Sequence, residues 1–129
     1  RLRMTTLYAI AQSRGALVAG TGNKCERYMG YFTKWGDGAC DFNPIADLTV
    51  TEIYEFLTYL KAPENIIRKA PSAGLFEGQT DEAEMGVTYD EIEMYMETGS
   101  CGSDNDARIH RAHAVTEHKR RMPLVYIDD

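Results

Sequence analysis

The chain has 129 residues, which suits one domain with a hydrophobic core. Apolar residues make up 43% and charged residues 26%, a composition that excludes the intrinsically disordered class. The net charge of −6 argues against general binding to a nucleic-acid backbone. No apolar run approaches the length of roughly 20 residues that a membrane-spanning helix needs.

The cysteines and the start of the chain bear on its cellular context. Cys25, Cys40 and Cys101 are an odd number and form no CxxC motif. We therefore expect reduced thiols in a cytoplasmic protein rather than a disulfide framework. The chain starts at Arg1, inside a helical pattern and without an initiator Met. We therefore expect it to be a piece of a longer protein.

The order of the first predicted elements is typical of an α/β fold. Apolar residues at helical spacing predict a helix from Met4 to Ala11, with Gly15 as its end. The apolar run at 16–19 predicts a buried strand that leads into a glycine turn, and a helix is expected to begin near Lys24. A buried strand followed by a glycine turn and a helix is typical of α/β folds.

Two capping boxes predict later helices. Residues 49–52, TVTE, begin a helix whose apolar side continues to Leu60. Residues 88–91, TYDE, begin another whose apolar side reaches Met96. Between these helices, residues 64–69 are expected to form a short helical turn. These local signals predict a chain that is rich in helix.

The remaining segments are less regular. Residues 70–86 contain glycine hinges and predict a long loop, which in a compact domain is often functional. Residues 99–106 form a linker, a last helix is expected over 107–120, and residues 124–127 predict a final strand or a docked tail. These strands are too few for a parallel sheet, so either segments outside this sequence complete it or the fold is mostly α, and we favour the missing segments.

The turn at residues 20–26, GTGNKCE, has features of a nucleotide site. Glycines after a strand let the backbone approach a ligand, and the N-terminus of the next helix favours phosphate. Thr21 offers a hydroxyl and Glu26 a carboxylate suited to Mg²⁺. The motif matches neither the dinucleotide fingerprint nor the Walker loop, so local physics favours a structural joint over a nucleotide site.

Residues 32–44, FTKWGDGACDFNP, combine charged side chains with turn formers. Lys34 can neutralise a phosphate or a carboxylate, and Asp41 can bind a ribose hydroxyl or a cation. Gly36 and Gly38 allow unusual backbone angles. A rigid turn with solvated charges explains the same residues equally well, so local physics leaves both interpretations open.

The histidines and cations near the end of the chain have structural and functional interpretations. His110 and His113 are helical neighbours, but only Glu117 offers a fitting additional ligand, so surface histidines are favoured over a zinc site. Residues 117–121, EHKRR, place cations near a helix C-terminus, where they suit the helix dipole or can capture a phosphate-bearing ligand. Both interpretations of this cluster stay open.

Five segments in order resemble the ammonia-dependent NAD synthetases. They are GTGNKCE, FTKWGDGACDFNPIADL, KAPSAGLFEGQTDE, GVTYDEIEMY and TEHKRR, and together they span essentially the whole chain. The resemblance implies an α/β, Rossmann-like fold of the adenine-nucleotide hydrolase type and a homodimer. It also implies that ATP and Mg²⁺ are used to adenylate the carboxylate of deamido-NAD, with release of pyrophosphate. Ammonia then displaces AMP and gives NAD⁺.

The resemblance implies roles for individual residues. Thr21 and Ser72 resemble ATP contacts, and Glu26 resembles a Mg²⁺ ligand. The residues implied to contact deamido-NAD are Arg1, Lys34, Asp41, His118 and Lys119. Asp37 has no assigned role. Residues 70–86 resemble a loop that closes over the active site and excludes water.

Two departures from the family pattern stand out. Val50 occupies a position where many members have a lysine that contacts ATP, and Lys61 or Lys69 is a candidate to replace that contact. The upstream ATP loop of SGGxDS type has no counterpart here. The resemblance therefore implies that residues 1–129 are the C-terminal part of one domain, whose partner is the missing N-terminal half of the same enzyme. We expect this chain alone to be inactive.

The expected organisation has three parts: a core segment at 1–69, the active-site loop at 70–86, and C-terminal helices and a tail at 87–129. Two alternatives remain. A non-catalytic dinucleotide-binding paralogue is favoured by Val50 and opposed by the retention of Glu26 and Ser72. A fragment of another ATP pyrophosphatase is opposed by TKWGDGACDFNP. No separate glutaminase segment is present, so ammonia is the expected nitrogen donor.

Overall fold

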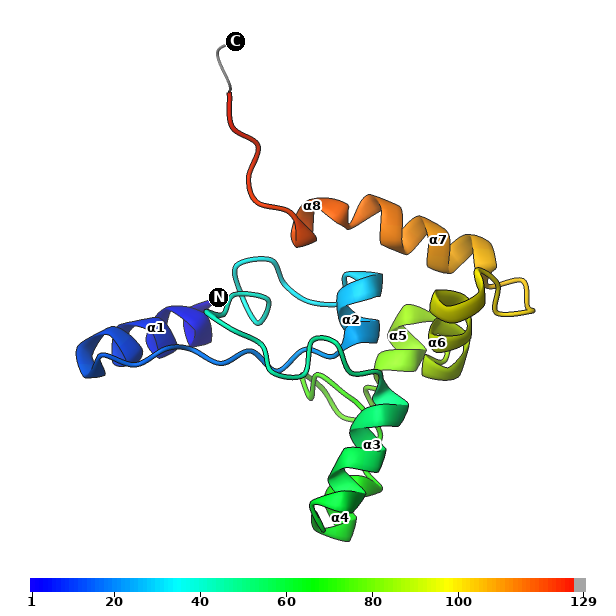
Figure 1. Cartoon of the computed structure of the whole chain (residues 1–129), viewed down its shortest axis with the longest axis horizontal. Helices are drawn as coiled ribbons and strands as arrows, with labels where there is room; N and C mark the ends of the chain where they lie inside the picture. Colours follow the sequence, from blue (N-terminus) through cyan, green and yellow to red (C-terminus); the bar gives the residue numbers. More distant parts are fainter. Residues whose placement is uncertain (127–129) are drawn as a thin grey trace.

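The computed structural model describes residues 1–126, and this part of the chain is helical. Its helices are α1 (Leu2–Arg14), α2 (Lys24–Met29), α3 (Val50–Tyr59), α4 (Glu64–Ile67), α5 (Asp81–Met85), α6 (Tyr89–Thr98), α7 (Asp106–Val115) and α8 (Glu117–Arg120). Figure 1 shows α2, α5, α6 and α7 gathered together, whereas α1 and the α3–α4 pair project from this group. No helix within residues 1–126 is long and apolar enough to cross a membrane.

The local signals for helix ends are confirmed. α1 ends at Gly15, which has left-handed backbone angles (φ 62°, ψ 32°) that glycine adopts without steric cost. Reciprocal capping boxes begin α3, between Thr49 and Glu52, and α6, between Thr88 and Glu91. In each box the threonine side chain accepts the N–H of the glutamate, whose side chain accepts the N–H of the threonine.

The parallel sheet is not confirmed. Within residues 1–126 the backbone forms one isolated parallel bridge, between Ala19 and Phe42, and no strand. The N–H of Asp41 donates to Val18 O at 2.9 Å, and the N–H of Gly20 donates to Phe42 O at 2.7 Å. The segment at 16–19 is therefore extended beside residues 41–42. It remains a bridge because no further segment of the described chain pairs with it.

Three predictions in the second half of the chain need correction. The predicted loop at 70–86 contains a helix, α5, which begins at Thr80 as its N-cap. The predicted helix at 107–120 is broken at Thr116, whose side chain bonds to the backbone oxygens of α7 and so competes with helix continuation. Residues 122–126 have no regular structure, and the rest of the predicted final strand lies outside the described residues.

The core lies among α2, α6, α7 and the segments that join them. Its buried members are Cys25, Met29, Val50, Val87, Tyr89, Ile92, Cys101 and Ile109. Tyr28 and His113 stack beside this core with their ring centroids 4.1 Å apart, and His113 Nδ1 lies 3.0 Å from Tyr28 O. His113 thus joins α7 to α2. All three cysteines are free thiols.

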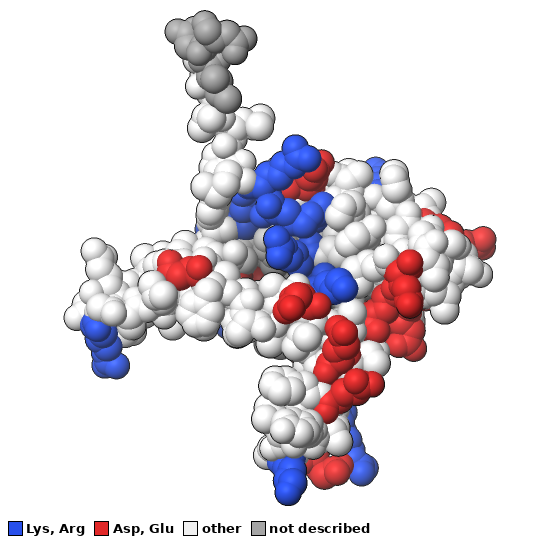
Figure 2. All heavy atoms as spheres, in the orientation of Figure 1, with Lys and Arg blue, Asp and Glu red and all other residues white. Residues whose placement is uncertain are grey.

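Charged side chains are segregated on the surface. Figure 2 shows Lys and Arg side chains gathered around α8, and Asp and Glu side chains gathered toward α3 and α6. The acidic side matches the long stretch at 71–107, which contains no Lys or Arg. The cavity described below lies where basic and acidic segments meet.

Candidate functional site

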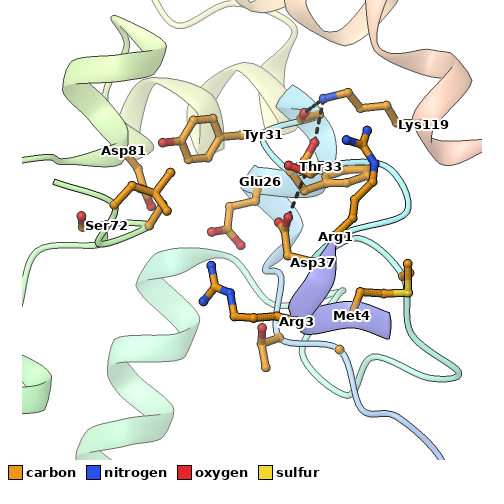
Figure 3. Close-up of a pocket in the computed structure, with 18 of the residues that line it drawn as sticks. Arg1, Arg3, Met4, Glu26, Tyr31, Thr33, Asp37, Ser72, Asp81 and Lys119 are labelled. Atoms are coloured by element: carbon orange, nitrogen blue, oxygen red, sulfur yellow. Dashed lines mark hydrogen bonds between the residues drawn. The ribbon is translucent and has the colours of Figure 1, made fainter. Parts of the chain in front are cut away.

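A cavity of about 710 Å³ lies among four segments that are far apart in the sequence. Its walls come from the start of α1, residues 18–26, the loop at 30–39, and the segment at 72–84, with Lys119 of α8 completing the wall. Five of the eight site residues predicted from the sequence line it: Arg1, Thr21, Glu26, Ser72 and Lys119. Figure 3 shows four of these five among the labelled residues around a common space.

Glu26 has both a structural and a cavity-facing position. Its Oε2 accepts the N–H of Asn23 at 2.7 Å, and its own N–H donates to Asn23 Oδ1 at 2.8 Å, so the pair forms a capping box for α2. Burial raises the pKa of Glu26, the backbone N–H of Asn23 opposes this rise, and the negative charges of Asp81 and Asp37 add to it. A bound cation would relieve this repulsion.

Close backbone approach explains the glycine that precedes Thr21. A Cβ atom on Gly20 would lie 2.6 Å from Cys40 Sγ and 3.0 Å from Asn43 Cβ. A larger residue here would therefore force the side chains of Cys40 and Asn43 to move. This close approach places Thr21, whose side chain is exposed, on the cavity wall.

The loop at 32–44 differs from its prediction in one respect. Its left-handed residue is Trp35 (φ 62°), and neither Gly36 nor Gly38 has positive φ. Gly38 is instead required because a Cβ atom there would overlap the ring of Phe32. Asp37 Oδ1 accepts the N–H of Thr33 at 3.1 Å, which closes the turn and places Asp37 on the cavity wall.

Three predicted site residues lie outside the lining of this cavity. Lys34 Nζ donates to the backbone oxygen of His118, whose side chain is exposed. Asp41 Oδ2 accepts the N–H of Val18 at 2.7 Å. Lys34 and Asp41 therefore join segments of the fold, whereas the structural interpretation of the loop expected solvated charges. Contact of Lys34, Asp41 and His118 with a dinucleotide stays a prediction.

Two cations of EHKRR, Lys119 and Arg120, bind carbonyl groups at and beyond the end of α2, whereas Arg121 pairs with Glu117. Lys119 Nζ donates to Gly30 O and Phe32 O, both at 2.7 Å. Arg120 donates to Tyr28 O at 3.1 Å and to the backbone oxygen of His113. The contacts with Tyr28, Gly30 and Phe32 lie at and just beyond the C-terminal end of α2, where cations suit the helix dipole, whereas the bond to His113 lies at the end of α7. They also hold Lys119 at the cavity wall.

Several lining residues were not singled out from the sequence. Tyr31 Oη donates to Glu84, and Gln79 Nε2 donates to Glu84 Oε2 at 2.9 Å. The bond from Tyr31 ties the segment at 70–86 to the end of α2, and the bond from Gln79 holds Glu84 in place within that segment. Arg3 and Asp81 also line the cavity. The sequence signal that could have identified Gln79 and Asp81 is the run GQTDE. Its acidic residues, however, are also typical of an ordinary helix N-terminus.

Comparison with known proteins identifies the family of this chain. A family model described as NAD synthase matches residues 1–123. The chain belongs to the NAD synthase family. It is 55% identical, over 125 residues, to an NH₃-dependent NAD⁺ synthetase from Carboxydothermus hydrogenoformans, with 97% of this chain and 51% of the relative covered.

Solved structures of this family have the same fold. A structure described as NMN synthetase from Francisella tularensis matches with a TM-score of 0.91 and 50% identity, covering 97% of this chain and 52% of that one. An NH₃-dependent NAD synthetase from Campylobacter jejuni matches with a TM-score of 0.73 and 32% identity, covering 98% and 52%. The chain thus spans about half the length of the NAD synthase relatives it matches.

Val50, where the resemblance implies a lysine in many members, lies in the core and not at the cavity. Val50 is buried at the start of α3 and belongs to the core cluster. Lys61 and Lys69 are exposed, and neither lines the cavity. The described residues therefore do not place either lysine at the cavity, and the expected replacement of an ATP contact by Lys61 or Lys69 stays a prediction.

Proposed function

We propose that this chain forms part of a ligase that uses ATP to amidate deamido-NAD with ammonia, giving NAD⁺, AMP and pyrophosphate through an adenylated intermediate. The observation that carries this proposal is the convergence of five predicted site residues on one cavity, from segments as far apart as Arg1 and Lys119. Because the chain spans half the length of its relatives, the activity is proposed for the whole protein. A homodimer and a cytoplasmic location are proposed from the same family resemblance.

The charges of the cavity suit this chemistry. A carboxylate is a poor acyl donor, so it must first receive a leaving group. Arg1, Arg3 and Lys119 bring positive charge to the cavity wall, where a nucleotide phosphate or a substrate carboxylate needs it. The segment at 70–86 can exclude water from the reactive adenylate because Glu84 ties it to Tyr31.

Glu26 is the proposed Mg²⁺ ligand of this chain. Within residues 1–126 no group of three or more His, Cys, Asp or Glu side chains is placed to hold a metal ion. Mg²⁺ fits such a site because it typically binds one or two carboxylates together with substrate phosphates and water. When bound, Mg²⁺ offsets the charge on the departing pyrophosphate.

An assay of NAD⁺ formation tests the proposal. The 129-residue chain is compared with a protein in which it is joined to the remaining half of the Carboxydothermus relative, using deamido-NAD, ATP, Mg²⁺ and ammonium. We expect activity in the joined protein alone, and a loss of about 100-fold on Glu26→Gln. Glu97→Gln, an exposed change on α6, is the control and should leave activity within about twofold. An inactive joined protein contradicts the enzyme proposal, whereas an active 129-residue chain contradicts its dependence on the other half.

A mononucleotide substrate is the second candidate. The Francisella tularensis structure, which is described as NMN synthetase, matches this chain with a TM-score of 0.91. The same assay with nicotinate mononucleotide in place of deamido-NAD separates the two candidates. A higher kcat/KM for the mononucleotide would assign NMN formation to this protein.

A further inference from the structure

One carboxylate on the cavity wall has a buried oxygen without a partner. Asp81 is only 2% exposed. Its Oδ2 accepts the hydroxyl proton of Tyr89 at 2.9 Å, but its Oδ1 has no hydrogen-bond partner among the described residues. A buried and unsatisfied charged oxygen is costly, so an occupant of the cavity that donates to it would stabilise this arrangement.

The groups around Asp81 are mostly hydrogen-bond acceptors. Tyr31 Oη donates its single proton to Glu84, so what it can offer a ligand is a lone pair. Burial raises the pKa of Tyr31, and the hydrogen bond to Glu84 and the negative charges of Asp81 and Glu84 add to this rise. The charge of Asp81 also raises the pKa of Glu26. Figure 3 shows the Tyr31 hydroxyl pointing toward Asp81, with the Glu26 carboxylate facing the same space. A fitting occupant therefore donates hydrogen bonds and carries positive charge.

The cations of the described residues do not fill this role. No Lys or Arg within residues 1–126 forms an ion pair with Asp81. Lys119, which also lines the cavity, donates to two backbone oxygens instead. Mg²⁺ is proposed at Glu26 instead, and the Mg²⁺ requirement measured below distinguishes a metal ion from a different occupant beside Asp81 Oδ1.

We propose that Asp81 Oδ1, together with Tyr31 Oη, binds the ammonium ion that supplies nitrogen to the reaction. This inference rests on the proposed function. Ammonium carries a single positive charge and four N–H donors, which matches a buried carboxylate oxygen beside a phenolic lone pair. The site gives ammonium a binding position of its own, at the edge of the segment 70–86 that closes the cavity.

The test uses the joined protein and measures KM separately for ammonium, deamido-NAD and ATP. Asp81→Asn keeps the shape of the side chain but removes its charge. We expect this change to raise the KM for ammonium about tenfold or more, with the other two KM values within about twofold. Tyr89→Phe is the matched control, because it removes only the bond to Oδ2. It should leave the KM for ammonium within about twofold.

Three outcomes of these KM measurements would overturn the inference. An unchanged KM for ammonium in Asp81→Asn means that the residue does not bind it. Equal increases in Asp81→Asn and Tyr89→Phe mean that Asp81 acts only through packing. A higher Mg²⁺ requirement with an unchanged KM for ammonium makes Asp81 a metal ligand. Absence of NAD⁺ formation by the unmutated joined protein instead overturns the proposed function itself.

A second variant covers the case in which Asp81→Asn does not fold. Tyr31→Phe leaves the pair of Asp81 and Tyr89 intact and removes one acceptor of the site. We expect the KM for ammonium to rise about threefold, since one neutral hydrogen bond is lost. An unchanged value in this folded variant overturns the inference.

Discussion

Glu26 and Glu91 occupy equivalent positions in two capping boxes, yet their surroundings shift their pKa values in opposite directions. Glu91 accepts the N–H of Thr88 at 2.9 Å and further hydrogen bonds from Asn105 and Ser103, which lower its pKa to about 2. Burial raises the pKa of Glu26, and nearby negative charges add to this rise. Both glutamates therefore cap a helix, but only Glu26 lies in surroundings where a cation is favoured.

The low pKa of Glu91 predicts a specific dependence of stability on pH. The ionised carboxylate stabilises the fold above its ordinary pKa of 4.5, and this contribution is lost as the pH falls toward about 2. Glu91→Gln should therefore lower the Tm at about pH 6, with a difference from the unmutated protein that disappears near pH 2. Thermal melts followed by circular dichroism measure this difference. Glu97→Gln should show no such trend, and a constant difference for Glu91→Gln across this range contradicts the assignment.

At the scale of elements, four described helices end at a glycine with left-handed backbone angles, and the space around these glycines differs. These glycines are Gly15, Gly30, Gly86 and Gly99. A Cβ atom on Gly30 would overlap the side chain of Thr116, whereas one on Gly99 would meet open space. Gly30 therefore joins the end of α2 to the junction of α7 and α8, the same region that holds Lys119 at the cavity.

A matched pair of substitutions separates backbone strain from this contact. Gly99→Ala should lower the free energy of unfolding by about 1 kcal/mol, because alanine is strained in the left-handed region. Gly30→Ala should lower it by about 3 kcal/mol, because a steric overlap with Thr116 is added to the same strain. Urea denaturation measures both values. Equal losses would mean that the packing of Thr116 against Gly30 contributes nothing.

At the scale of the whole molecule, a small core holds elements that would otherwise make few contacts. Ile92 of α6 and Ile109 of α7 are fully buried, whereas Leu2 of α1 is 86% exposed and Tyr59 of α3 is 79% exposed. Figure 1 shows α1 and α3 projecting away from the central helices. The stability of the chain therefore depends on the cluster among α2, α6 and α7.

Truncation of isoleucines tests this dependence. Ile92→Ala should lower the free energy of unfolding by about 2–5 kcal/mol, because it leaves a cavity in the core. Ile66→Ala, at a position that is 48% exposed on α4, should cost less than about 1 kcal/mol beyond its change in helix propensity. Chemical denaturation gives both values. Similar losses in the two variants would show that the central cluster does not dominate stability.

The candidate site was predicted in part from the sequence. Ordered motifs identified Arg1, Thr21, Glu26, Ser72 and Lys119, which all line the cavity. The same motifs also selected Lys34, Asp41 and His118, which lie outside its lining. Charged residues in a motif can bind a ligand or hold the backbone, and the motif alone does not distinguish these tasks. Asp37 was named without a role, and Tyr31 and Asp81 were not singled out.

The sequence by itself determined the helix boundaries that depend on local interactions, and the family. The capping boxes at Thr49 and Thr88 and the stop at Gly15 act within a single helical turn, so their residues suffice to predict them. Only the tertiary structure decided that residues 16–19 form a bridge rather than a strand, and that Asp81 lies opposite Tyr31. These outcomes depend on which distant segments pack together. Ala19 and Phe42 are 23 positions apart and Tyr31 and Asp81 are 50 apart, and packing at such separations leaves no periodic pattern in the sequence.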